Sequence, residues 1–292
     1  MKNFRFNKII VIESLDPNER HTGKELYDDL IARMPYLHSE LLADYKKVNT
    51  LKEWDALMND ILTECNNTGN IPILHLEIHG EGSGKGLVTS SNELIPLEHV
   101  GNQFRDINVA TGCNLFITLG VCKGLYLLFN MHMNKPMPFI GAVGSFDTIL
   151  NSDIYIRYYD FYDTFFRTLD IASAYVALQK ANPDLDSKYR YMPADELFYK
   201  NYQEYLNKQC TDGALKARAK ESIATLSCKN RHERRLKEKL FIKQEKIERG
   251  KYFRNHAATF FMTNEFPENK ERFDVPKDFK KLKERYDNLV MV

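Results

Sequence analysis

The sequence predicts an α/β protein, a three-layer α/β/α sandwich on a mostly parallel central sheet with a helical C-terminal appendage. Short apolar runs alternate with segments whose apolar residues recur every three or four positions, which is the pattern of β-α-β units. Near residue 195 the character changes, because long helical patterns and basic residues take over. We therefore expect one domain over residues 1–194 and a helical, partly basic extension over residues 195–292.

The elements expected before residue 81 alternate between strand and helix. The run KIIVIESL is rich in β-branched residues and ends at Asp16-Pro17, so it predicts a buried strand. Thr50 precedes a stripe of apolar residues and is expected to cap a helix. In chain order we expect a strand at 8–15, a helix from 22, a weak strand at 44–49, a helix at 51–65 and a strand at 71–80.

The elements expected after residue 81 complete the sheet and add the appendage. They are a hairpin across 86–97, a helix at 104–110, strands at 114–122 and 138–144, a long helix at 159–181, and helices at 195–208 and 213–251. In a parallel sheet, ligands and chemistry collect at the carboxyl ends of the strands. This rule points to the His79-Gly80 pair, to Cys122 and to the residues after Gly144.

The composition is that of a soluble, folded chain. Of the 292 residues, 43% are hydrophobic, 28% charged and 12% aromatic, which argues against disorder. The longest apolar run, over residues 115–129, contains Lys123 and is too short to span a membrane. The start of the chain lacks the apolar run of a secretion signal. Five cysteines without a spacing pattern fit a reducing compartment, so we expect a cytoplasmic protein with no membrane partner.

The charge is distributed unevenly along the chain. Residues 1–212 hold 20 basic and 28 acidic side chains, whereas residues 213–251 hold 13 basic and 5 acidic ones. A basic helix can track phosphates, but this one has few aromatic residues and contains glutamates. A solvated helix packed along an acidic surface of its own domain or of a partner is therefore the favoured interpretation, and nucleic-acid binding is the weaker alternative.

The glycine-rich stretch HGEGSGKGL after the strand at 71–80 invites comparison with a phosphate-binding loop. Such a loop needs glycine, four residues, then Gly-Lys and Ser or Thr at the start of a helix. Here only three residues separate Gly80 from Gly84-Lys85, and Gly86 stands at the hydroxyl position. A hairpin pattern follows where the helix should begin. The nucleotide interpretation fails on spacing and context, and we expect no cofactor.

The same stretch contains residues suited to cysteine chemistry. A cysteine nucleophile needs an imidazole to manage protons and backbone N–H groups to hold an oxyanion. Cys122 is expected at the end of one core strand and His79 at the end of another, 43 residues earlier. If the two strands are neighbours, both side chains lie at one edge of the sheet. Gly80 would allow a substrate backbone to approach closely.

In order and context these pieces resemble the caspase-like cysteine peptidases, specifically the CHAT family. The similar pieces span about residues 8–182 and include ILHLEIHGEG, NELIPLEHV, LFITLGVCKG, PFIGAVGSFD and FYDTFFRTLDIASAYVALQKAN. The separation of His79 and Cys122 is similar to the roughly fifty residues of caspases. The caspase block Q-A-C-x-G retains only Cys122 and Gly124 here, so the resemblance does not imply aspartate specificity.

The resemblance implies a cysteine endopeptidase that acts on a protein through an acyl-enzyme. Cys122 would attack the scissile carbonyl, His79 would protonate the leaving amine, and the N–H groups of Gly80 and Cys122 would hold the oxyanion. Asp147, and after it Asp153, would favour a basic P1 residue. CHAT proteins usually carry a sensor module that this sequence lacks. We therefore expect a separate activating protein partner, by analogy within a prokaryotic stress or phage-defence (antiviral) pathway.

Other interpretations of the same residues remain open. A cysteine at a strand end is commonly a small buried hydrophobe, His79 would fit a satisfied core histidine, and Asp147 a turn or capping residue. His75, Glu77 and His79 alternate onto one strand face and could contribute to a zinc site. No further ligand is evident, so no metal is expected. A catalytically silent caspase-like scaffold or binding module is the alternative function.

Overall fold

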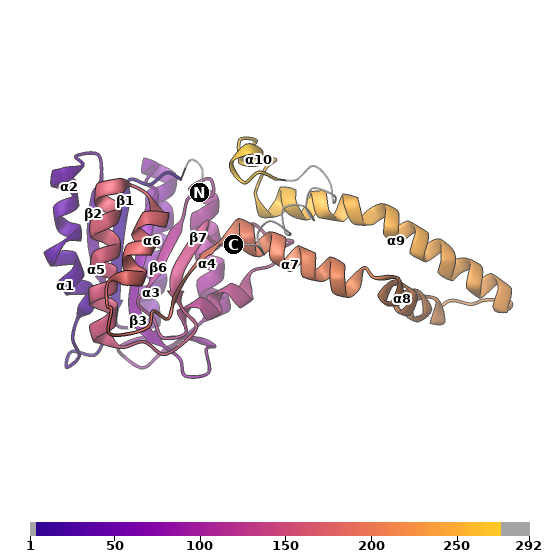
Figure 1. Cartoon of the computed structure of the whole chain (residues 1–292), viewed down its shortest axis with the longest axis horizontal. Helices are drawn as coiled ribbons and strands as arrows, with labels where there is room; N and C mark the ends of the chain where they lie inside the picture. Colours follow the sequence, from indigo (N-terminus) through magenta and orange to yellow (C-terminus); the bar gives the residue numbers. More distant parts are fainter. Residues whose placement is uncertain (1–3, 276–292) are drawn as a thin grey trace. The chain divides into compact units, whose positions relative to one another are not determined.

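The computed structural model describes residues 4–275, which form two compact units (Figure 1). Within the described residues, the first unit comprises residues 4–132 and 136–194, and the second comprises residues 133–135 and 195–275. The division after Ala194 coincides with the change of sequence character near residue 195. No helix among residues 4–275 is both long and apolar enough to cross a membrane.

The first unit is built on a mixed, mostly parallel sheet with strand order β2-β1-β3-β6-β7-β8. Neighbouring strands from β2 to β7 run parallel, and β8 pairs antiparallel with β7. The antiparallel β4–β5 hairpin extends from β3. The strands are β1 (Lys8–Ser14), β2 (Leu42–Lys47), β3 (Pro72–Gly80), β4 (Gly86–Val88), β5 (Leu94–Pro96), β6 (Phe116–Leu119), β7 (Gly141–Ser145) and β8 (Tyr189–Pro193).

Helices cover both faces of this sheet (Figure 1). On one face, Trp54 of α3 and Phe104 of α4 join the apolar core with Leu74 of β3. On the other face, α1 and α5 pack over the sheet, and Tyr162 of α5 contacts His75 edge-on. The helices of this unit are α1 (Thr22–Asp29), η1 (Ile31–Arg33), α2 (Met34–Leu37), α3 (Leu51–Thr68), α4 (Leu97–Ala110), η2 (Gly124–Asn130), α5 (Asn151–Thr168) and α6 (Ile171–Lys180).

The predicted fold class is therefore confirmed: an α/β protein with a mostly parallel central sheet, flanking helices and C-terminal helices. The expected cap is also present, since the Thr50 hydroxyl accepts a hydrogen bond from the Glu53 N–H at the start of α3. The expected hairpin forms as β4 and β5.

Two expected elements differ from the structure in ways that affect the site. The strand predicted over residues 114–122 is shorter in the structure, where β6 ends at Leu119. Cys122 therefore lies in a turn three residues beyond the strand. The helix predicted over residues 159–181 is instead two helices, α5 and α6. Leu169 ends α5 in the left-handed conformation with φ 53°, and Asp170 caps α6 by accepting from the Ser173 N–H. The prediction of one long helix was wrong, because the apolar spacing continues across the break.

The second unit is helical, with α7 (Ala194–Gln209), α8 (Asp212–Ala224), α9 (Arg231–Phe260) and α10 (Asn269–Arg272). Aromatic side chains pack α7 against α9, with Phe198 4.8 Å from Phe260 and Tyr202 4.9 Å from Phe253 between ring centroids. The single helix predicted over residues 213–251 is divided by residues 225–230. Asn230 begins α9 by accepting from the Glu233 N–H. Residues 276–292 of the predicted extension lie outside the described residues.

Candidate functional site

The site expected from the sequence lies where β3 and β6 end side by side. The two strands are parallel neighbours, with His75 opposite Thr118 and Leu76 opposite Leu119. Their carboxyl ends therefore meet at one edge of the sheet. There the backbone of Gly80 approaches Cys122 so closely that a Cβ on residue 80 would lie 1.7 Å from the Cys122 carbonyl oxygen. Only glycine fits this contact, which brings the backbone of Gly80, the residue after His79, against the backbone of Cys122.

Cys122 is half-buried in a tight turn. Lys123, the residue after it, has φ 58°, a left-handed conformation that is strained for a non-glycine residue. Backbone bonds hold the turn: the Lys123 N–H donates to the Asp147 carbonyl at 3.0 Å, and the Gly124 N–H donates to the Val121 carbonyl at 3.1 Å. Strain of this kind persists where the surrounding structure fixes the chain. The turn therefore presents the cysteine from a rigid frame.

The Cys122 sulfur lies against the backbone of the segment after β7. The Ile149 N–H donates to Sγ at 3.4 Å, and the Ile149 carbonyl lies 3.7 Å from Sγ. An N–H directed at sulfur stabilises negative charge on it, and the carbonyl can accept from the protonated thiol. The backbone of Ile149 thus gives Sγ one hydrogen-bond donor and one acceptor.

His79 is exposed over 47% of its side chain and is held by a carboxylate that the sequence analysis did not identify. Its Nε2 lies 2.8 Å from Oε2 of Glu19. Partial burial raises the pKa of Glu19. The opposing hydrogen bonds from His79 and from the Asp16 backbone prevail, so the pKa lies below its usual value. This contact orients the imidazole through Nε2, so Nδ1 is the ring nitrogen that remains for proton exchange with a substrate or the cysteine.

Glu19 could have been found by applying the strand-end rule to the first strand as well. It follows β1, which is the parallel neighbour of β3, and it therefore belongs to the same sheet edge as His79. Sequence separation hid the contact, because the two residues are 60 positions apart. No local pattern marks a loop glutamate as the partner of a distant histidine.

The two aspartates proposed for a basic P1 residue have different environments. Asp147 is exposed, and its carbonyl takes the Lys123 N–H beside the nucleophile candidate. Asp153 is buried, and both of its carboxylate oxygens lie 2.8 Å from Nε of Arg157. An additional bond from Asn182 at 2.8 Å completes this arrangement. We therefore correct the assignment of Asp153, whose carboxylate neutralises a buried guanidinium, and retain Asp147.

The other polar residues of β3 form a buried network instead of a metal site. His75 bonds to the Thr118 hydroxyl at 2.8 Å and to Glu77 at 3.1 Å, and Glu77 also accepts from the Thr22 hydroxyl at 2.9 Å. Among residues 4–275, no group of three or more His, Cys, Asp and Glu side chains is placed to hold a metal ion. His79, the third member of the considered zinc face, bonds to Glu19.

Burial makes the Glu77 carboxyl difficult to ionise. Desolvation raises its pKa, the bonds from His75 and Thr22 oppose the shift, and the charge of Glu13 adds to it. The carboxylate also explains why residue 120 is glycine, since a Cβ there would lie 2.8 Å from Oε2 of Glu77. This network therefore sets the backbone two residues before Cys122.

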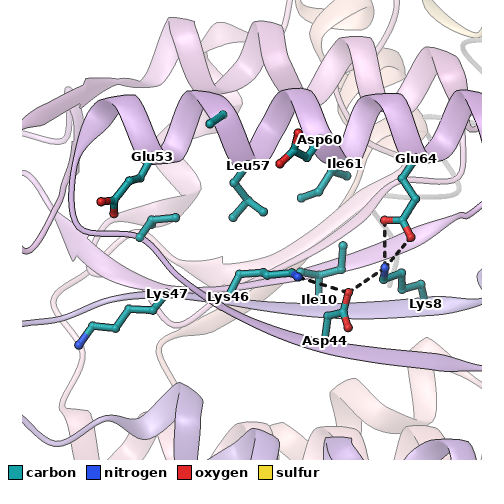
Figure 2. A pocket seen from close by; sticks show the side chains of 12 residues that line it. Lys8, Ile10, Asp44, Lys46, Lys47, Glu53, Leu57, Asp60, Ile61 and Glu64 are labelled. Carbon is teal, nitrogen blue, oxygen red and sulfur yellow. Dashed lines mark hydrogen bonds and ion pairs between the residues drawn. The ribbon is translucent and has the colours of Figure 1, made fainter.

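A separate groove of about 440 Å³ lies between the edge strand β2 and α3 (Figure 2). Figure 2 shows that its lining holds lysines and carboxylates, some of which pair with one another. Lys8 bonds to Asp44 at 2.8 Å and to Glu64 at 2.7 Å, and Lys46 lies 3.8 Å from Asp44. None of the residues proposed from the sequence lines this groove. Its paired charges give it no preference for an anion or a cation.

Comparison with known proteins identifies no relative: no protein-family model matches the chain, and no curated protein matches it significantly.

Proposed function

We propose that this protein is a cysteine endopeptidase that cleaves a protein substrate with Cys122 as nucleophile and His79 as acid and base. The observation that carries the proposal is the close approach of Gly80 to Cys122 at the ends of two adjacent parallel strands. It supports the proposal because Gly80 directly follows His79 in the chain, so the backbone next to the histidine adjoins that of Cys122. The bond from Glu19 to His79 supports it, because a nucleophile's base is commonly oriented by a third group.

The proposed reaction proceeds through an acyl-enzyme. The Cys122 thiolate attacks the scissile carbonyl carbon, and the N–H groups of Gly80 and Cys122 receive the charge that develops on its oxygen. The imidazolium of His79 gives its proton to the leaving amine as the C–N bond breaks. Water then attacks the thioester, His79 takes the proton from that water, and Cys122 leaves as the thiolate. Glu19 holds the imidazole in place during both steps.

The substrate preference belongs to the same proposal. Asp147 is exposed and follows β7, and its backbone carbonyl contacts the turn of Cys122; we propose that its carboxylate attracts a lysine or arginine at P1. By the CHAT resemblance, we further propose a cytoplasmic enzyme that a separate protein partner activates, in a prokaryotic stress or phage-defence pathway. A catalytically silent scaffold is the alternative that the following experiment separates from it.

The test is digestion of a proteome-derived peptide library, read by mass spectrometry. The wild-type protein should cleave, whereas Cys122→Ala and His79→Ala should not, with unchanged circular dichroism. Cys228→Ala is the matched control, because this half-exposed cysteine lies in the second unit, and it should cleave like wild type. Cleavage by Cys122→Ala at the wild-type rate would contradict the mechanism. If neither wild type nor any variant cleaves the library, with or without candidate activators, the alternative of a catalytically silent scaffold is favoured.

The P1 preference has its own arm in the same experiment. Sites cleaved by wild type should be enriched in arginine and lysine at P1, and Asp147→Asn should remove the enrichment. Asp184→Asn, at another exposed aspartate of the first unit, should leave it unchanged. Cleavage without a basic preference in the wild type would remove Asp147 from its role while leaving the dyad intact.

A further inference from the structure

The second unit contains a groove that the peptidase proposal does not use. It lies between α8 and α9, near the loop that joins them, and has a volume of about 780 Å³. A second hollow of about 380 Å³ continues from it, since both are lined by Lys220, Arg235 and Glu238. The two hollows therefore form one continuous surface, which we call the α8–α9 groove.

The α8–α9 groove is strongly basic. Its lining includes two cations of α8, Lys216 and Lys220, and three of α9, Arg231, Arg235 and Lys239. All five side chains belong to exposed residues, and none makes an ion pair with another residue of the described chain. The acid in the lining is Glu238, which already lies 3.5 Å from Arg234. The five positive charges are therefore not neutralised within the unit.

Two other glutamates of α9 pair with cations outside this cluster. Glu233 pairs with Lys237 at 2.9 Å, and Glu245 pairs with Arg218 at 3.3 Å. In the sequence these glutamates interrupt the basic run, which counts against nucleic-acid binding. The structure removes that objection for one face, since the pairs occupy other cations and leave the groove positive.

The unpaired cations form regular rows. Arg231, Arg235 and Lys239 follow one another at intervals of four residues on α9, and Lys216 and Lys220 do so on α8. At a rise of about 1.5 Å per residue, successive cations are about 6 Å apart along the axis. Like charges four residues apart destabilise a helix. Such rows are favourable when a regularly charged anion lies between them.

We propose that the α8–α9 groove binds the phosphodiester backbone of a nucleic acid duplex. A chain of regularly spaced phosphates complements two rows of regularly spaced cations. The lining contains no aromatic side chain among the described residues, so it lacks the stacking surfaces with which proteins hold unpaired bases. The contacts are therefore to the backbone, independent of base sequence, and favour a duplex over a single strand.

An acidic protein is the other anion that such a groove could receive. Protein interfaces are anchored by buried aromatic and apolar side chains. The lining of the α8–α9 groove offers no aromatic anchor. Its apolar residues include Ile223, which is buried within the unit, and Leu226, which is exposed. Five unpaired cations without an aromatic anchor favour phosphates over an acidic protein. The α3–β2 groove of Figure 2 differs, because its lining mixes lysines with carboxylates and Lys8 pairs there with both Asp44 and Glu64.

The test measures fluorescence anisotropy of labelled 20-base-pair DNA and RNA duplexes and of matching single strands, titrated with the full chain in a Cys122→Ala background. Because this variant lacks the proposed nucleophile, the binding result does not depend on whether the peptidase proposal is right. With about five phosphate contacts, the affinity for duplex should fall roughly 10²–10³-fold between 50 and 200 mM salt. The affinity for single strands should be lower than that for duplex.

Matched variants locate the binding. Arg235→Gln/Lys239→Gln removes two groove cations, whereas Lys251→Gln/Arg254→Gln removes one lysine and one arginine at exposed positions of α9 outside the groove. The first pair should weaken binding at least about tenfold and reduce the salt slope by about two. The second pair should change affinity less than about twofold. Equal weakening by both pairs, or absence of duplex binding at 50 mM salt, would overturn the proposal. Tighter binding of poly-glutamate than of duplex would overturn it in favour of an acidic protein.

Discussion

The contact of Gly80 with Cys122 leads to the sharpest prediction, the effect of Gly80→Ala. A Cβ on residue 80 would lie 1.7 Å from the Cys122 carbonyl oxygen and 2.8 Å from the carbonyl carbon. Since Cβ atoms essentially never approach other atoms within 3.0 Å, the two segments must separate by about 1.3 Å. The atoms that this Cβ would meet belong to the Cys122 backbone, so no flexible side chain can move aside.

The expected magnitude has two parts. Overpacking of this kind destabilises a protein by about 1–3 kcal/mol. A displacement of about 1 Å at a catalytic group lowers the rate by about 10²-fold. Gly80→Ala should therefore lower the melting temperature and slow peptide cleavage about a hundredfold, with the rate measured well below the new melting temperature. The assays are calorimetry and initial-rate cleavage of one peptide from the library.

Gly82→Ala is the matched control for this prediction. Gly82 lies two residues further along the same segment, and a Cβ there would meet nothing within 4 Å. This variant should match wild type in both assays. If Gly80→Ala also matched wild type in stability, the close approach of the two strand ends would be wrong. If it lost stability but cleaved normally, the approach would stand and its link to catalysis would fail.

Three further predictions concern carboxylates of the first unit: Glu19, Glu77 and Asp153. Glu19→Gln should slow cleavage several-fold and change the free energy of unfolding by less than about 1 kcal/mol, because the pair with His79 is partly exposed. Since the pKa of Glu19 is lowered in the folded protein, the stability from this pair should be present above the ordinary glutamate pKa and lost as the pH falls. An unchanged cleavage rate would remove Glu19 from its positioning role. Burial raises the pKa of Glu77, so its contribution to stability is present at low pH and lost as the pH rises. Between pH 5 and pH 8, the melting temperature of Glu77→Gln should therefore fall less than that of wild type. Equal falls in melting temperature for the two proteins would contradict this. Asp153→Ala leaves the buried Arg157 without its partner and should destabilise the protein by about 3–5 kcal/mol, whereas a stable protein with altered P1 preference would restore Asp153 as a specificity residue.

The parts of the fold that were predictable are those in which local pattern decides the structure. β1 and β3 are continuous β-branched or apolar runs, buried on both faces, and their predicted and observed limits differ by one residue at one end. The cap by Thr50 was predictable because a hydroxyl before an amphipathic segment has few other uses. The position of His79 near the end of β3 follows from the same patterns.

The parts that were not predictable depend on distant residues or on backbone conformation. Gly120-Val121-Cys122 continues the apolar run of β6, so the sequence gives no sign that the chain turns there at Lys123. The left-handed conformation of Leu169 is rare for leucine and likewise has no local signal. The pairing of Glu19 with His79 and of Asp153 with Arg157 requires knowledge of which elements meet. Hydrophobic pattern indicates burial, but it does not identify partners.

The central claim, that Cys122 and His79 act as a pair, is tested most directly by covalent trapping with a peptidyl acyloxymethyl ketone that carries arginine at P1. Intact mass and peptide mapping report the extent, rate and position of labelling. The account predicts a single adduct on Cys122 in wild type, loss of the adduct in Cys122→Ala, and labelling at least about a hundredfold slower in His79→Gln, which corresponds to about 2.7 kcal/mol of lost activation. Labelling of Cys122 at the same rate with and without the His79 imidazole would contradict it.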